Sequence, residues 1–139
     1  LDVMTNLKNR NYLNDNLSYW ESNKIYPQAV VIIDLNNISV INDSKGHEEG
    51  DKQIKSAANI LIKTQRENSE IIRTDGNEFL IYLVGYEENQ IVTYVNKLMK
   101  HLPYEYGASM GYFMIKSEST TIDDAINEAL IKMRENKGE

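Results

Sequence analysis

Two polar segments of this chain carry residue types that could hold a metal ion and a phosphate. One is a turn bearing Asp75, Asn77 and Glu78 between two apolar runs, and the other is Asp34, near the end of the apolar run 29–35. Carboxylate and amide oxygens are ligands that suit Mg²⁺, which usually also binds substrate phosphates. A strand end facing a hairpin tip would bring Asp34 and Asn77 together. An Asp at a strand end is also a common cap or turn residue, so the pattern leaves both interpretations open.

The turn itself is predicted to be the tip of a β-hairpin. Asp75 and Gly76 lie between β-favouring runs, which indicates a type I′ turn with positive φ at both central residues. In this interpretation Asp75 is a left-handed turn residue. It could alternatively swing in as a surrogate metal ligand beside Asn77.

Composition restricts the classes of function. A chain of 139 residues fits one domain, and its net charge of −6 argues against a nucleic-acid or anionic-membrane surface. The absence of cysteine excludes disulfides, thiolate zinc sites and thiol nucleophiles. Together with the lack of a long apolar run, it favours a cytoplasmic protein or the cytosolic portion of a membrane protein.

The elements that must position these residues follow from hydrophobic periodicity. Residues 29–35 form a continuous apolar run, predicted to be a central strand buried on both faces. A helix is expected to begin after Asn9, a second strand spans about 108–115, and a last helix has Thr121 as its N-cap. A polar segment, 36–51, precedes a helix, and Pro103 ends another. The buried stripes of the two middle helices are Ile54, Ala57, Ala58, Leu61 and Ile62, and Ile91, Tyr94, Val95, Leu98 and Leu102. This order predicts an α+β, ferredoxin-like layer with helices packed on an antiparallel-rich sheet.

The segment from Asn42 to Asp51 reads on its own as a polar loop with two glycines for tight turns. It also matches every fixed position of Asn-Asp-x-x-Gly-His-x-x-Gly-Asp, a motif of the GGDEF family of diguanylate cyclase domains. The hairpin resembles that family's Arg-x-Gly-Gly-Asp/Glu-Glu-Phe, with matches at Arg73, Gly76, Glu78 and Phe79 and departures at Asp75 and Asn77. Residues 2–10 and 108–111 are also similar to family motifs. The resemblance implies a nucleotidyl-cyclase palm, one domain over residues 1–139 of a longer multidomain protein, and activity in cyclic di-GMP signalling.

The resemblance also implies roles for individual residues. Asn42 and Asp51 take the positions that bind the guanine edge. Asp34, the Leu35 backbone and Asn77 take the metal positions, but Asn77 replaces the catalytic acid and would hold Mg²⁺ weakly. Arg134 keeps a phosphate-binding cation in register, and Lys137 could substitute for another.

Further departures weaken the remaining sites. At the inhibitory site, Arg66 is retained but Ser69 replaces the acid, so cyclic di-GMP would bind weakly there; alone, Arg66 also fits a solvated helix-end cation. Loss of a charged metal ligand could remove on the order of 4 kcal/mol of transition-state stabilisation, about a thousandfold in rate.

Three hypotheses follow. The leading one is a degenerate, catalytically inactive or nearly inactive GGDEF domain that acts as a GTP-responsive regulatory module for attached sensory or effector domains. The second is an active diguanylate cyclase with altered metal ligation, working as a homodimer on two GTP. The third is a protein-interaction module that no longer uses nucleotides.

Overall fold

A five-stranded sheet forms the centre of the computed structural model, which describes residues 1–102 and 107–138. The strand order is β1–β3–β4–β2–β5, and only the β1–β3 pair is parallel. The strands are β1 (Lys8–Asn9), β2 (Gln28–Leu35), β3 (Ser69–Asp75), β4 (Glu78–Val84) and β5 (Ala108–Ile115). The antiparallel-rich α+β prediction is therefore confirmed.

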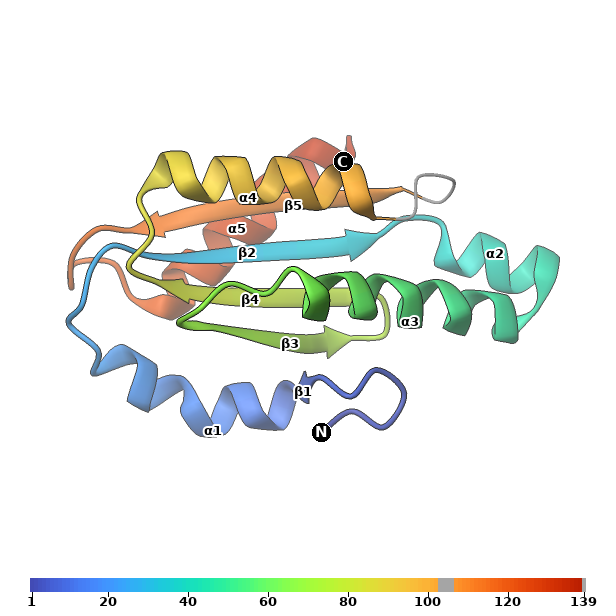
Figure 1. The fold of residues 1–139 in the computed structure, drawn as a ribbon, viewed down its shortest axis with the longest axis horizontal. Helices are drawn as coiled ribbons and strands as arrows, with labels where there is room; N and C mark the ends of the chain where they lie inside the picture. Colours follow the sequence, from blue (N-terminus) through green and yellow to red (C-terminus); the bar gives the residue numbers. More distant parts are fainter. Residues whose placement is uncertain (103–106, 139) are drawn as a thin grey trace.

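Helices cover both faces of the sheet (Figure 1). They are α1 (Arg10–Glu21), α2 (Ile38–Lys45), α3 (His47–Lys63), α4 (Glu88–His101) and α5 (Ile122–Lys137). The side chains of α2, α3 and α4 share one apolar cluster, and those of α1 and α5 share the other. Within the described ranges, no helix is long and apolar enough to cross a bilayer.

β2 separates the two clusters, because successive side chains of a strand point to opposite faces of a sheet. Val31 and Ile33 pack with α3 and α4, whereas Val30 and Ile32 pack with α1 and α5, and all four side chains are at most 1% exposed. The prediction of a central strand buried on both faces is confirmed. Asp34 comes one residue before the end of this rigid strand, so its backbone position is fixed by neighbours on both sides.

Both predicted N-caps are present. The Asn9 side chain accepts a hydrogen bond from the Tyr12 backbone N–H at 3.0 Å, and that of Thr121 accepts one from Asp124 at 3.0 Å. α4 ends at His101, and the predicted helix stop at Pro103 lies outside the described residues.

The interpretation of residues 42–51 as a polar loop was wrong, because α2 begins within the preceding polar segment and α3 follows it at once. Ile38 and Ile41 are buried one helical turn apart, which suffices to form α2 in a segment whose other residues are mostly polar. The chain then turns at Gly46, with φ of 90°, directly into α3. Gly50 is a buried helical residue instead of a turn residue. Ile62 was also placed wrongly in the buried stripe, since it is 41% exposed, and Ile60 packs against the core instead.

The predicted type I′ turn was wrong as well. None of Asp75, Gly76 and Asn77 has positive φ, and Asp75 is the last residue of β3. The β3–β4 register shifts between Arg73 and Asp75, so Asp75 pairs with Glu78 after an irregularity at Thr74. Such a bulge adds twist where the strands end, and here it accompanies a turn without left-handed residues.

Candidate functional site

The candidate site lies where the end of β2 meets the tip of the β3–β4 hairpin. In the sheet register, Asp34 stands opposite Glu78 of β4 on one side and Ser109 of β5 on the other. The Asn77 carbonyl accepts a hydrogen bond from the Leu35 backbone N–H at 2.9 Å. The predicted proximity of Asp34 and Asn77 is therefore observed, and the main chain holds it in place.

The side chains of Asp34 and Asn77 contact each other directly. The Asn77 amide nitrogen donates to Asp34 Oδ1 at 2.8 Å and to the Leu35 carbonyl at 2.9 Å. Both partners only accept hydrogen bonds, which requires the amide to present its nitrogen to them. The second Asp34 oxygen, Oδ2, lies 3.1 Å from the ammonium of Lys137, in the last turn of α5.

This donor set does not fit a divalent cation. Two of the nominated metal ligands, Asp34 and the Leu35 carbonyl, accept hydrogen bonds from the third, and Asn77 thereby turns N–H donors toward the point where a metal requires an oxygen. Lys137 adds a positive charge at the same carboxylate. Elsewhere in the described part of the chain, no group of three or more His, Asp or Glu side chains could hold a metal ion.

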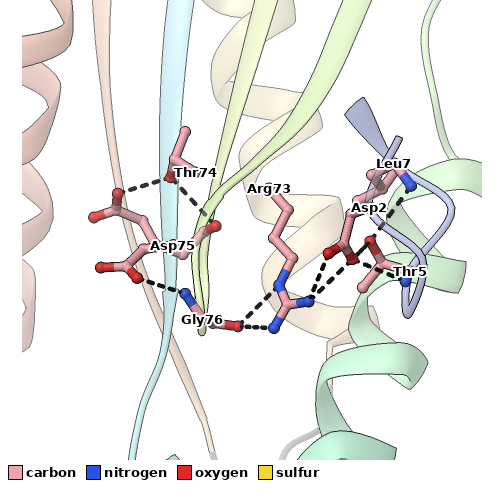
Figure 2. A network of polar contacts seen from close by, with 8 residues as sticks. Asp2, Thr5, Leu7, Arg73, Thr74, Asp75 and Gly76 are labelled. Atoms are coloured by element: carbon pink, nitrogen blue, oxygen red, sulfur yellow. Dashed lines mark hydrogen bonds and ion pairs between the residues drawn. The ribbon is translucent and has the colours of Figure 1, made fainter. Parts of the chain in front are cut away.

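An ion pair to the N-terminal turn fixes the hairpin tip (Figure 2). Arg73 Nη1 lies 3.1 and 3.0 Å from the two Asp2 oxygens, and its Nε and Nη2 donate to the Gly76 carbonyl at 3.1 and 2.7 Å. Thr5 donates to Asp2 through its backbone N–H and its hydroxyl. Burial by itself would raise the pKa of Asp2, but the hydrogen bonds from Thr5 and Arg73 outweigh it and lower this pKa.

The remaining polar side chains of the hairpin bind the hairpin itself. Asp75 is exposed, and its Oδ1 accepts the Gly76 N–H at 2.8 Å. The Thr74 hydroxyl donates to Glu78 Oε2 at 2.8 Å, while the Thr74 carbonyl accepts from Arg10 Nε at 2.9 Å. Phe79 is fully buried beneath the tip. The hairpin is thus held both by its own contacts and by contacts from Arg10 and Asp2.

The two nominated guanine-binding residues lie on adjacent helices. Asn42 is in α2, and its Oδ1 is buried with no hydrogen-bond partner among the described residues. A Cβ placed on Gly50 would lie 1.8 Å from that oxygen, so the missing side chain at this position of α3 leaves room for the Asn42 amide in its present orientation. Asp51, the next residue, is exposed. The pair therefore offers one solvent-facing carboxylate and one carbonyl oxygen that lacks a donor.

Arg66 lies at a different surface. Its guanidinium carbon stands 5.4 Å from the centre of the Tyr94 ring, and the Ser69 hydroxyl bonds back to the Arg66 carbonyl. Both Arg66 and Tyr94 line a cavity of about 270 Å³. Arg66 is thus a cation stacked on an aromatic ring, in contrast to a freely solvated helix-end cation.

The two nominated phosphate-binding residues, on the last turn of α5, differ in their surroundings. Arg134 is exposed, and its side chain has no partner among the described residues. Lys137 instead pairs with Asp34. Sequence reasoning missed this contact, and also the contact between Asp2 and Arg73, because these partners lie 103 and 71 residues apart and no spacing rule connects them. The one sequence feature that pointed to these residues was that each of them lay in a segment similar to a family motif.

Comparisons with known proteins agree with the fold and the motifs. The family described as "Diguanylate cyclase, GGDEF domain" matches residues 1–139. Diguanylate cyclase DgcP of Escherichia coli is 30% identical over 98% of this chain and 44% of its own length. The probable diguanylate cyclase DgcJ of the same organism is 31% identical over 98% of this chain and 29% of its own. The chain thus spans less than half the length of these relatives.

Solved structures share the fold at lower identity. The GGDEF domain of FimX from Pseudomonas aeruginosa has a TM-score of 0.87 at 16% identity and covers 99% of this chain and 94% of its own. The GGDEF domain of DgcB from Caulobacter crescentus, in complex with c-di-GMP, has a TM-score of 0.87 at 18% identity, covering 99% and 89%. At this identity the likeness establishes the fold.

Proposed function

The chain belongs to the GGDEF family of diguanylate cyclase domains, a family of cyclic di-GMP signalling, and from that premise we propose that it binds a guanine nucleotide without converting it. In this proposal it is a regulatory domain of a longer cytoplasmic or membrane-attached protein. The observation that carries the proposal is the direct contact of Asn77 with Asp34 at 2.8 Å.

Loss of catalysis follows from that contact. A neutral amide can neither accept the proton of an attacking hydroxyl nor add negative charge to a cation site. Among the three nominated metal positions only Asp34 keeps a carboxylate, and Lys137 already balances its charge. The neighbouring carboxylate of Glu78, opposite Asp34 in the register, accepts a hydrogen bond from the Thr74 hydroxyl. The substitution removes on the order of 4 kcal/mol of transition-state stabilisation, about a thousandfold in rate.

Retention of nucleotide binding rests on the other motif. A guanine base offers N–H donors at N1 and N2, and Asp51 is a solvent-facing acceptor that suits them. Asn42 can pair with the base through its amide, and its Oδ1 lacks a donor in the described structure. The amide N–H groups of Asn42 can donate to guanine O6 or N3, which are acceptors that the Asp51 carboxylate cannot serve.

A domain that binds without turnover can still transmit a signal. A ligand shifts a conformational equilibrium by its differential affinity for the two states, and no chemistry is required. The relatives are at least twice as long as this chain, so attached domains are natural recipients of such a shift. Product inhibition at Arg66 is expected to be weak, because Ser69 binds the backbone and provides no carboxylate.

Calorimetric titration of GTP into the purified domain tests this proposal, with ATP as the specificity control. We expect micromolar, guanine-specific binding that is nearly the same with Mg²⁺ or EDTA. Asn42→Ala should weaken it by roughly tenfold or more, the effect of about 1.4 kcal/mol. Asn59→Ala is the matched control. It changes an exposed asparagine of α3 and should leave the affinity for GTP unchanged. Absence of binding at millimolar GTP would reject the proposal in favour of a nucleotide-independent interaction module.

One observation favours the alternative of an active cyclase, namely that similar proteins are named diguanylate cyclases. In that case Asp34→Ala should abolish turnover and Asn77→Asp should raise it sharply. A wild-type domain without turnover, and an Asp34→Ala variant that retains GTP binding, would eliminate this alternative.

A further inference from the structure

We propose that Lys137 is the resident cation of the strand-end site, and that the domain excludes divalent metal ions there even in the absence of nucleotide. This inference deepens the proposed function, because it explains why nucleotide binding should be independent of Mg²⁺. It is argued from the contacts of Asp34, Asn77 and Lys137, and its test uses no nucleotide.

Both carboxylate oxygens of Asp34 and the Leu35 carbonyl already accept a hydrogen bond. Asp34 Oδ1 is bonded to Asn77 at 2.8 Å, Asp34 Oδ2 to Lys137 at 3.1 Å, and the Leu35 carbonyl to Asn77 at 2.9 Å. A metal would have to displace the ammonium and also rotate the Asn77 amide. Rotation would present one oxygen to the metal, but it would take both N–H donors away from two acceptors.

Charge favours the ammonium as well. The Asp34 side chain is 15% exposed and that of Lys137 is 29% exposed, so solvent only partly screens the pair. One carboxylate and one ammonium are neutral together. A divalent ion at the same carboxylate would compete with the ammonium, and Asp34 would be its only charged ligand among the three nominated metal positions, whereas Mg²⁺ is normally accompanied by carboxylates and phosphates.

α5 delivers the ammonium to this place as part of a fixed element. The neighbouring Asn136 amide donates to the Met110 carbonyl of β5 at 2.6 Å. Farther back, a Cβ on Gly111 would lie 2.3 Å from the Ala129 carbonyl oxygen, which shows how closely α5 packs on β5. Lys137 is the final residue of the helix, where the carbonyl ends favour positive charge. Its side chain therefore reaches Asp34 from an anchored helix end.

Titration of Mn²⁺ into nucleotide-free protein, followed by electron paramagnetic resonance of the free ion, tests this assignment. We expect no stoichiometric binding to the wild-type domain at millimolar Mn²⁺. Asn77→Asp supplies the missing carboxylate, and combining it with Lys137→Met should tighten Mn²⁺ binding by roughly tenfold relative to Asn77→Asp alone. Lys132→Met in the Asn77→Asp background is the matched control. Lys132 lies on the same helix, and its ion pair in the described part of the chain is with Glu135, at 4.0 Å.

Two results would overturn the assignment. One is wild-type binding of Mn²⁺ that Asp34→Asn abolishes, and the other is a double variant that binds no tighter than Asn77→Asp or than the Lys132 control. Should the double variant fail to fold, the side-chain ¹⁵N resonance of Lys137 decides the question. It is measured in the wild-type domain, with and without Mn²⁺, and in the single variant Asp34→Asn. It should shift on Asp34→Asn and stay unchanged on adding Mn²⁺, whereas the opposite pattern would contradict the proposal. If the domain did not bind GTP, the Mn²⁺ titration and the ¹⁵N measurement would still test this assignment, because both use nucleotide-free protein.

Discussion

Asn77 donates a side-chain amide N–H to the Asp34 carboxylate across 2.8 Å, so a hydrogen bond joins the hairpin tip to the end of β2. The same amide reaches the Leu35 carbonyl, which makes Asn77 the polar link between two chain segments that lie more than forty residues apart in sequence. Since the contact is satisfied without any ligand, it is expected to contribute to the stability of the free domain.

Asn77→Asp should therefore destabilise the metal-free domain, because it replaces a hydrogen bond by two facing carboxylates and leaves the Leu35 carbonyl without its donor. We expect a loss of about 1–3 kcal/mol in the free energy of unfolding. Urea denaturation in EDTA measures it, with the exposed Asn96→Asp on α4 as the control. Equal stability of Asn77→Asp and wild type would show that the contact contributes nothing.

A pH dependence is expected from the ion pair between Asp2 and Arg73. The pKa of Asp2 is lower in the folded than in the unfolded state, because the hydrogen bonds from Thr5 and Arg73 outweigh the effect of burial. Its contribution to stability is therefore fully present above the ordinary value of 3.8 and is lost as pH falls through the folded pKa. Unfolding free energies measured from neutral pH down to acid should fall less steeply for Asp2→Asn than for wild type. The exposed pair of Lys24 and Glu118 gives the control, Glu118→Gln, which should follow wild type. Parallel curves for Asp2→Asn and wild type would contradict this assignment.

Tyr94 and Tyr82 provide a matched pair of hydroxyl deletions. The Tyr94 hydroxyl is buried without a partner among the described residues, and burial raises its pKa to about 12 although Arg66 opposes this. Tyr94→Phe should stabilise the domain by about 1 kcal/mol, since it removes an unsatisfied polar group. The Tyr82 hydroxyl donates to buried Gln28 at 2.7 Å, so Tyr82→Phe should cost about 1–2 kcal/mol. Thermal unfolding measures both, and changes of the same sign would refute the argument.

Two glycines should respond differently to alanine. At Gly111 an added Cβ meets the Ala129 carbonyl oxygen and the Met133 backbone nitrogen, each at 2.3 Å, so Gly111→Ala must push α5 away from β5 at a cost of about 3 kcal/mol. At Gly76 nothing lies within 4 Å and φ is not positive, so Gly76→Ala should change stability by less than about 0.5 kcal/mol. Chemical denaturation distinguishes them. A large loss at Gly76 would indicate that the turn needs glycine after all.

Much of the fold could be predicted from the sequence because its strongest patterns are local. The apolar run of β2, the N-caps at Asn9 and Thr121, and the helical stripe of α4 all depend on neighbouring residues. The errors arose where tertiary contacts override local preference. α2 exists because Ile38 and Ile41 find a core to bury against, and the hairpin turn avoids positive φ through a bulge at Thr74.

The candidate site was predictable only in part. Proximity of Asp34 and Asn77 followed from a strand end and a hairpin tip on neighbouring strands. Which atom of the Asn77 amide faces Asp34 depends on the surrounding acceptors, and the partner of Lys137 depends on how α5 lies across the sheet. Neither fact is encoded in a local pattern. Lys137 was therefore predicted to bind phosphate, whereas in the structure it pairs with the Asp34 carboxylate.

The most direct test of the central claim is to incubate the domain with GTP and Mg²⁺ at high protein concentration and to quantify cyclic di-GMP by chromatography. GTP binding is measured by calorimetry on the same sample. The account predicts bound GTP and no cyclic di-GMP above a protein-free control. Formation of cyclic di-GMP that Asp34→Ala abolishes would contradict it and make this domain an active cyclase.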